Sequence, residues 1–375
     1  MKTLVLAGGG HAHVEVLRRF ALDRPPGVRV VLISPDAHTP YSGMLPGLLA
    51  GHYSRDDCHV DLRPLCDRAG AAFAVTRVEG IDLTGRLVRC ADGQTREFDA
   101  LSLDVGSTPD LRSVPGAAEH SVPVKPVSGL LEVWRDMEAR CERRPAGRLR
   151  LAVVGGGAGG AEVALAMRRR CRREDPRDEP EIAIVTNGLL PGHSARARAL
   201  VARALAGRRI TLMDKRLVVR LSAGEIHCAL GERVPADLIV WATGAAAVPW
   251  VGQSGLACDD RGFAAVNDGL QSPSHPFVFA AGDVAAVTSG PVPKAGVFAV
   301  RQGPVLAANL RSYLAGEPLR PFRPQPRYLA LISTGDGHAI ASWGGLAWQG
   351  RWVWAWKDRI DRTFMRKYQA GRTPP

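Results

Sequence analysis

The stretch TLVLAGGGHAHVEVL, residues 3 to 17, begins with an apolar run, passes through three glycines and ends in a segment with helical apolar spacing. This order predicts a strand, a tight turn and a helix. The first N–H groups of such a helix are unpaired and carry partial positive charge, so a diphosphate can bind there. We expect Gly8 and Gly10 to leave room for its approach.

One residue of this turn departs from the usual spacing. His13 stands where a third small residue would let the helix pack closely on the strand. Two interpretations remain open. The imidazole fills a gap between a helix and a strand that lie slightly apart, or His11 or His13 contacts the bound cofactor.

A second copy of the pattern lies at residues 149 to 167, LRLAVVGGGAGGAEVALAM, where the spacing Gly155, Gly157 and Gly160 is complete. A further apolar strand follows each helix, VRVVLIS at 28 to 34 and EIAIVT at 181 to 186. Strands that alternate with helices predict parallel, doubly wound sheets. A single glycine turn is weak support for a nucleotide site, and two strand-flanked copies are much stronger.

The composition is that of an ordinary globular chain, with 375 residues, 46% hydrophobic and 23% charged. The net charge of +12 favours anionic partners, but no nucleic-acid motif accompanies it, so we expect no nucleic-acid partner. The seven cysteines form no CxxC motif, which predicts a reducing, cytoplasmic location without a metal site. We expect neither a signal peptide nor a membrane-spanning helix.

Further motifs follow in a fixed order. Residues 279 to 283, FAAGD, resemble the late FAD motif, whose Asp binds a ribitol hydroxyl, and residues 241 to 244, WATG, resemble the turn that leads back to the first domain. LDVGS at 103 to 107 is a degenerate counterpart of that turn. Together these motifs resemble the two-dinucleotide-domain flavoproteins of the pyridine nucleotide-disulfide oxidoreductase superfamily over roughly residues 1 to 315. The resemblance implies FAD in the first unit and NADH or NADPH in the second.

The predicted fold class is α/β, with two Rossmann-like three-layer domains, the second inserted in the first, and a C-terminal α+β region. The predicted boundaries are 1–115 and 246–320 for the FAD-binding domain, 116–245 for the NAD(P)-binding domain and 321–375 for the C-terminal region.

Two segments narrow the resemblance. HTPYSGMLPGLLAGH at 38 to 52 lacks the cysteine pair of the disulfide reductases and resembles the flavin-contacting loop of type II NADH dehydrogenases and sulfide:quinone reductases. VPKAGVFAVRQGPVLAANL at 292 to 310 resembles the helix start that those enzymes place under the flavin. GGGHAHVEVLRRF at 8 to 20, with SPDAHTPYSGMLPGLLAGHY and WKDRIDRTFMRKY, most resembles the flavoprotein family found fused ahead of selenophosphate synthetase.

The resemblance assigns candidate residues to each cofactor. The FAD candidates are Gly8, Gly9, Gly10, His11, Ala12, His13, Ser34, Pro35, Ser42, Gly43, Gly106, Gly282, Asp283, Ala295 and Gly296. The NAD(P) candidates are Gly155, Gly157, Gly160, Glu162 and Gly244.

Three residues are catalytic candidates. Glu162 is expected beside the nicotinamide, or it is simply an acid favoured in the first helical turn. Lys294, or the helix start after it, would stabilise negative charge on the reduced flavin, and the alternative is a solvated lysine. Gln302 would lie near the acceptor pocket, but the residues favour the alternative, a plain helical role.

The resemblance implies an FAD-dependent NAD(P)H dehydrogenase that passes electrons to a quinone or another small acceptor. A reductase of selenium or sulfur compounds and a non-catalytic flavin or nucleotide sensor are the alternatives. Both ribose-binding acids are missing, with Ser34 in the first unit and Thr186 in the second, which weakly favours NADPH. The second nucleotide site is alternatively vestigial, and a homodimer is compatible with the sequence.

The tail RWVWAWKDRIDRTFMRKY, 351 to 368, repeats large apolar residues at every fourth position. These are Trp352, Trp356, Ile360 and Phe364. Such spacing predicts one helical face, and Arg and Lys residues flank it. This face either lies on an anionic membrane surface, as a peripheral protein would, or docks on the flavin domain.

Overall fold

Buried apolar runs form the first of two parallel sheets. The computed structural model describes residues 1–143, 149–175 and 178–369, with the side chains of 141–143 left out of the description. The strand order is β21-β9-β1-β2-β5, all parallel. The strands are β1 (Lys2–Ala7), β2 (Val28–Ser34), β5 (Ala71–Val75), β9 (Ala100–Leu103) and β21 (Val278–Ala280).

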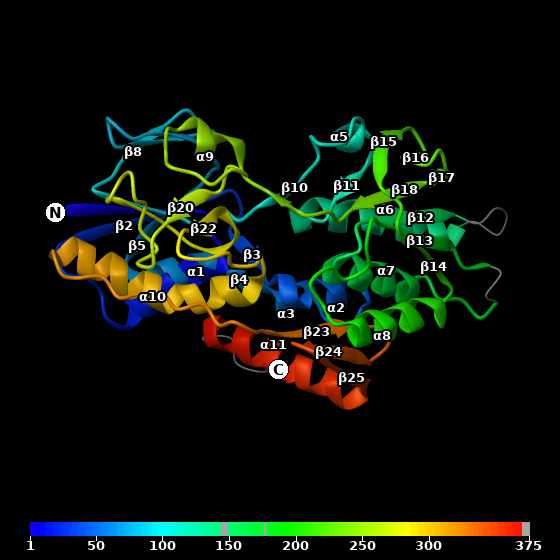
Figure 1. Ribbon diagram of the computed structural model, residues 1–375. Helices are drawn as coiled ribbons and strands as arrows, with labels where there is room; N and C mark the ends of the chain where they lie inside the picture. Colours follow the sequence, from blue (N-terminus) through cyan, green and yellow to red (C-terminus); the bar gives the residue numbers. More distant parts are fainter. Residues whose placement is uncertain (144–148, 176–177, 370–375) are drawn as a thin grey trace.

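Helices cover this sheet, and the predicted first helix packs against a late one. α1 contacts α10 and α4. In Figure 1, α1 and α10 lie below the sheet, whereas β8, α9 and β20 lie above it. The elements are α1 (His11–Leu22), α4 (Leu62–Ala69), α9 (Pro249–Gln253), α10 (Gly296–Ala315), β6 (Val78–Asp82), β7 (Leu87–Cys90), β8 (Thr95–Glu97), β20 (Ala264–Val266), β22 (Ala285–Val287) and the 3-10 turn η3 (Gly282–Val284).

The second sheet repeats the first in architecture, with the order β11-β18-β12-β13-β14. Helices α6, α7 and α8 and the antiparallel sheet β15-β16-β17 accompany it. The bounds are β11 (Val122–Pro123), β12 (Arg150–Val154), β13 (Glu181–Val185), β14 (Ile210–Met213), β15 (Val218–Ser222), β16 (Glu225–Cys228), β17 (Arg233–Pro235), β18 (Leu238–Trp241), α5 (Ala117–His120), α6 (Val127–Arg143), α7 (Ala158–Arg170) and α8 (Ala195–Ala206). The predicted fold class, α/β with two Rossmann-like units, is confirmed.

Two short strands join the sheets. β10 (Thr108–Pro109) and β19 (Ala245–Ala246) pair antiparallel where the chain leaves the first sheet and returns to it. We propose that the predicted domain boundaries, 1–115 with 246–320 and 116–245, follow these crossings.

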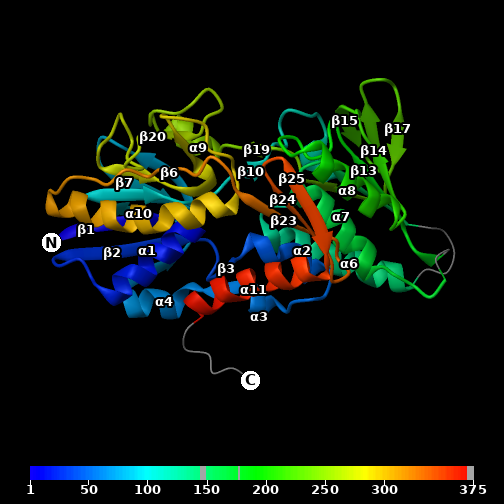
Figure 2. The same ribbon diagram turned by 60° about the horizontal axis from the view of Figure 1, so that its bottom comes forward.

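The C-terminal region lies under both units (Figures 1 and 2). A three-stranded antiparallel sheet leads directly into a long helix, which contacts α3 and β4 of the first unit. The sheet also contacts α7 and α8 of the second unit. The elements are β3 (His38–Pro40), η1 (Ser42–Met44), α2 (Leu45–Leu49), α3 (Arg55–Cys58), β4 (His59–Asp61), β23 (Leu329–Ser333), β24 (Ala339–Trp343), β25 (Leu346–Gly350) and α11 (Arg351–Tyr368).

Candidate functional site

The first glycine turn connects β1 to α1 as predicted, but its glycines are needed for a different reason. Gly8 has φ 97°, and a Cβ there would lie 2.4 Å from the Asp104 carbonyl oxygen. A Cβ on Gly10, the N-cap of α1, would lie 2.4 Å from the Asp104 carboxyl group. The side of these glycines that a Cβ would occupy therefore faces the chain after β9. Their expected role in leaving room for a diphosphate stays a prediction.

His13 is the residue that replaces the third glycine, and its ring is fully buried. Nδ1 lies 2.7 Å from the Gly8 carbonyl oxygen, and Nε2 lies 2.8 Å from the Ser102 hydroxyl. Since a carbonyl only accepts, Nδ1–H donates and Nε2 accepts from Ser102. Burial lowers the pKa of His13 to about 4, so the ring is neutral. These contacts favour the interpretation that His13 fills the space between α1 and β9.

Asp104 was missed as a site residue because it belongs to the degenerate LDVGS turn. Its Oδ2 accepts hydrogen bonds from the backbone N–H groups of Ala12, at 2.8 Å, and His13, at 3.0 Å. Burial raises its pKa to about 7. The first turn of α1 therefore already holds one carboxyl group.

His11, the first residue of α1, has a ring nitrogen that is suited to a ligand. Its ring lies against Tyr41 and Phe364, with centroids 5.4 and 6.0 Å away. Nε2 is buried and has no hydrogen-bond partner in the described part of the chain. Burial, and then the positive charge of Lys125, lower its pKa to about 4. A neutral imidazole with an unused nitrogen fits a polar group of a bound cofactor.

Asp283 follows the Gly282 turn of the late FAD motif. It accepts from the Ser107 hydroxyl at 3.2 Å and from Lys125 Nζ at 2.8 Å. Lys125 lowers the pKa of Asp283, so the carboxylate is charged. The buried Gln302 accepts from the Gly282 N–H at 2.6 Å through Oε1. Gln302 thus holds the turn that carries Asp283, and Lys125 is a site residue that sequence motifs did not indicate.

The loop of residues 38–52, which resembles a flavin-contacting loop, lies beside the start of α10. A Cβ on Gly296, the first residue of α10, would lie 3.4 Å from the Ser42 hydroxyl oxygen. Lys294 points elsewhere: its Nζ donates to the Ala285 carbonyl and lies 3.9 Å from the centre of the Phe263 ring. Burial lowers its pKa to about 8. Lys294 is thus engaged by the Ala285 carbonyl and the Phe263 ring, and the role of the helix start at Ala295 and Gly296 beside the flavin stays a prediction.

The remaining FAD candidates are Gly9, Ser34, Pro35, Gly43 and Gly106. Ser34 ends β2, and its hydroxyl donates to the Asp36 carbonyl at 3.1 Å, with Pro35 between them. A Cβ on Gly9 would lie 3.0 Å from that hydroxyl oxygen. Gly43 and Gly106 lie in the flavin-contacting loop and the LDVGS turn respectively.

The second glycine turn joins β12 to α7. A Cβ on Gly160 would lie 2.2 Å from the Gly155 carbonyl oxygen, so the close helix packing expected of the third glycine is present. The Cβ positions of Gly157 and Gly244 face open space. Thr243 Oγ1 beside them is buried without a hydrogen-bond partner in the described chain. The space beside Gly157 is therefore open, whereas the Asp104 carboxyl group fills the corresponding space beside Gly10.

Glu162 lies in the first turns of α7, and the C-terminal region covers it. Its Oε1 accepts from the Ser333 N–H at 2.8 Å. Burial raises its pKa to about 7, against the effect of Lys357. Its role beside a nicotinamide stays a prediction.

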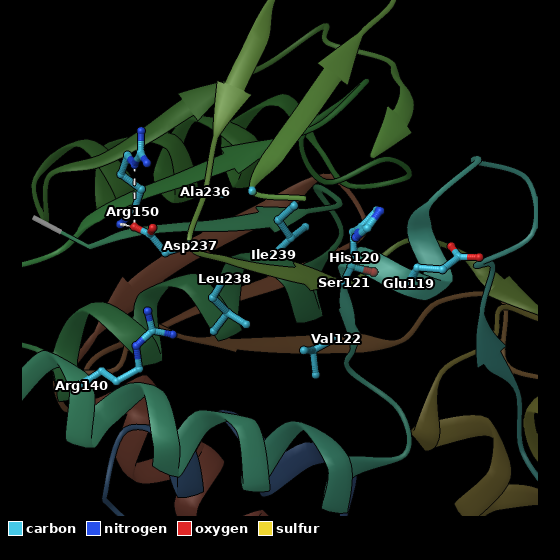
Figure 3. Close-up of a pocket in the computed structure, with 11 residues that line it drawn as sticks. Glu119, His120, Ser121, Val122, Arg140, Arg150, Ala236, Asp237, Leu238 and Ile239 are labelled. Carbon is cyan, nitrogen blue, oxygen red and sulfur yellow. Dashed lines mark hydrogen bonds and ion pairs between the residues drawn. The ribbon is translucent and has the colours of Figure 1, made fainter. Parts of the chain in front are cut away.

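A hollow of about 450 Å³ lies at the opposite edge of the second sheet (Figure 3). Arg150 and Leu238, which line it, begin β12 and β18, whereas the glycine turn follows the end of β12. The hollow is therefore separate from the predicted nucleotide site.

Helix α11 buries a different face from the one that docking on the flavin domain would require. Trp352, Trp356 and Ile360 are exposed, whereas Phe364 stacks on Tyr41 at 4.3 Å. The buried face consists of Val353, Lys357, Asp361, Met365 and Tyr368. Docking of the whole aromatic stripe on the flavin domain is therefore wrong for its first three residues. The charged residues Lys357 and Asp361 can be buried because each pairs with the other.

Cysteines give no redox pair within the described chain. Cys58, Cys66, Cys90 and Cys228 are buried free thiols, Cys258 is a half-buried free thiol, and Cys171 is buried. Burial raises the pKa of Cys58 and of Cys66 to about 12. The side chain of Cys141 lies outside the described residues. Among those residues no cluster suits a metal ion, and no helix has the length and apolarity to cross a membrane.

These groups fit FAD. The starts of α1 and α10, the buried Nε2 of His11 and the carboxylate of Asp283 supply the donors and acceptors that a dinucleotide with a ribityl chain needs. The family model for pyridine nucleotide-disulphide oxidoreductases matches residues 2–303. The chain belongs to this family. Membership confirms the predicted superfamily of oxidoreductases.

Two of the curated relatives are an NADH dehydrogenase-like protein and a demethylphylloquinone reductase. An NADH dehydrogenase-like protein of Mycobacterium tuberculosis is 28% identical over 61% of this chain, and the alignment spans 59% of that relative's length. A demethylphylloquinone reductase of Synechocystis is 24% identical over 75% of this chain and 71% of its own.

Solved structures share the fold. The sulfide:quinone oxidoreductase of Aquifex aeolicus superposes with a TM-score of 0.82 at 20% identity, over 100% of this chain and 93% of that one. NDH2 of Plasmodium falciparum in complex with NADH gives 0.82 at 15% identity, over 99% of each chain.

Proposed function

We propose that the protein oxidises NADH or NADPH through FAD and passes the electrons to a quinone at a membrane surface. One observation carries the choice of acceptor. Helix α11 presents exposed Trp352 and Trp356 on one side, while Lys357 on its other side donates to the Gly43 carbonyl at 2.6 Å. The same helix thus joins an apolar outer surface to the flavin-contacting loop.

The apolar outer surface is larger than one helix. We call the membrane patch the exposed residues Trp343, Leu346, Trp352, Trp356 and Ile360. The rings of Trp348, Trp352 and Trp356 stack in sequence, with centroids 6.5 and 6.4 Å apart. Exposed Arg351, Arg359 and Arg366 flank it. Tryptophan beside arginine suits the interface of an anionic bilayer, where quinones dissolve.

The chain's residues have separable tasks in this proposal. FAD supplies hydride acceptance and onward electron transfer. The open turn at Gly157 binds the nicotinamide nucleotide through the start of α7. Asp283, fixed by Lys125 and by the Gln302-held turn, orients the ribityl chain. Glu162, whose pKa of about 7 lets it exchange a proton near neutrality, is proposed to act beside the nicotinamide.

Anaerobic stopped-flow absorbance tests the function in two steps. Rapid bleaching of the flavin band by NADH or NADPH, followed by recovery on mixing with a short-chain ubiquinone, is expected. Bleaching by sulfide or selenide alone would instead support the selenium or sulfur reductase, which rests only on the resemblance. No bleaching by any donor would support a sensor and contradict the proposal.

A further inference from the structure

A buried carboxyl group lies between the two FAD motifs. Asp104 is 3% exposed, and its Oδ2 accepts hydrogen bonds from the backbone N–H groups of Ala12 and His13. Its Oδ1 faces the other motif, since a Cβ on Gly282 would lie 2.6 Å from that atom. Asp104 thus contacts the helix start that binds a diphosphate and the turn that carries Asp283.

The surroundings of Asp104 do not neutralise its charge. The described hydrogen bonds to its carboxyl group come from backbone N–H groups, and no described ion pair includes it. Asp283 adds a second negative charge close by, which Lys125 pairs at 2.8 Å. A bound FAD diphosphate adds two further negative charges at the start of α1. An ionised Asp104 would repel it, whereas a neutral carboxyl group would not.

We propose that Asp104 takes up one proton from solution when the protein binds FAD. The balance is one carboxylate and one proton giving one carboxylic acid, with no electrons transferred. Oδ2 continues to accept from the two N–H groups, and the proton resides on Oδ1, which faces the Gly282 turn. Asp104 is thereby a positioning residue that makes FAD affinity dependent on pH.

The site raises the pKa of Asp104, which favours the protonated carboxyl group. Burial and then Asp283 raise the pKa of Asp104 to about 7, although the two N–H groups oppose the shift. Near neutral pH the flavin-free protein therefore holds Asp104 partly ionised. Binding is strongest when that ionised fraction is small.

Other titratable groups face the same space and need separate controls. His13 on α1 and His11 have pKa values of about 4, so both stay neutral between pH ~6 and pH ~8.5. Lys294, coupled to Asp283, has a pKa of about 8 and would also weaken FAD binding as it loses charge. Replacing Lys294 by Arg keeps the positive charge over the whole range.

The test is a titration of the full chain, stripped of flavin, with FAD, followed by quenching of flavin fluorescence. For one proton with a pKa near 7, Kd rises about thirtyfold from pH ~6 to pH ~8.5 when the complex keeps the proton throughout. Asp104→Asn preserves the acceptor oxygen and removes the titration, so its Kd should stay constant. Lys294→Arg should keep most of the wild-type slope.

Calorimetry supplies a measurement that needs no variant. Titrations in two buffers with different ionisation enthalpies give the proton uptake, expected near ~0.9 per FAD at pH ~8 and near ~0.1 at pH ~6. Uptake near zero at the higher pH would overturn the inference, as would an Asp104→Asn protein that keeps the wild-type slope. A Lys294→Arg protein with no slope would also overturn it. A chain that binds no FAD at any pH would overturn the cofactor assignment as well.

Discussion

A histidine in place of a glycine determines how the first helix is held to its sheet. The His13 ring bridges the Gly8 carbonyl and the Ser102 hydroxyl, and both side chains are fully buried. Ser102→Ala should therefore lower the free energy of unfolding by about 1–3 kcal/mol, because His13 Nε2 loses its donor. Urea denaturation measures the change. The exposed Thr363→Ala is the matched control, expected within about 0.5 kcal/mol of wild type.

The half-buried Glu162 in the second unit predicts a pH-dependent stability. The pKa of Glu162 is raised to about 7 in the folded chain, so its contribution is present at low pH and is lost as pH rises through that value. Glu162→Gln should unfold with about 1–3 kcal/mol more free energy than wild type at pH ~8, and with little difference at pH ~5. Glu119→Gln, at an exposed position, is the control. Equal pH profiles for wild type and Glu162→Gln would contradict the assignment.

At the same scale, the sequence indicated which residues lie near the cofactor motifs but not what they contact. Glycine spacing gave Gly8 and Gly10 correctly as positions without side chains, yet the neighbour that requires this is Asp104. Lys125 and Asp283 are separated by most of the second unit in sequence, and no local pattern predicts their pairing. Contacts of this kind depend on the packing of distant segments.

Among the elements, helix α11 is stabilised by a charged pair inside an apolar contact. Lys357 and Asp361 lie 2.6 Å apart, with side chains 7% and 6% exposed. Lys357→Met leaves Asp361 unpaired and should cost about 3–5 kcal/mol, whereas the double change Lys357→Met with Asp361→Leu should cost much less. Thermal unfolding, with hydrogen exchange of α11, measures both.

The matched control for that cycle is Arg359→Met, an exposed position on the same helix. It should change stability by no more than about 0.5 kcal/mol. A single variant as stable as wild type would show that the pair does not hold α11 in place.

Strands were predictable because buried parallel strands are apolar runs. VRVVLIS coincides with β2, Val28–Ser34, and EIAIVT with β13, Glu181–Val185. Helix α11 was also predicted, but not its buried face. Apolar residues occupy both of its sides, and period alone does not distinguish a membrane face from a packed one.

For the whole molecule, the C-terminal region places one apolar surface toward the outside. Replacing Trp352, Trp356 and Ile360 by Ser should reduce co-sedimentation with anionic vesicles at least about tenfold, because burial of these side chains supplies most of the apolar contact. Leu230→Ser is the control: it changes an exposed leucine in the second unit and should bind vesicles as the wild type does. Unchanged binding by the triple variant would contradict the membrane patch.

The start of α1 and the Asp283 turn are expected to hold FAD, and every proposed electron transfer depends on this binding. Heat release of flavin from the purified chain, quantified by absorbance after reconstitution with excess FAD, tests it directly. Because the first unit is proposed to bind FAD and the second a nicotinamide nucleotide, about one FAD per chain is expected. A colourless protein that takes up no FAD at micromolar concentration would contradict it.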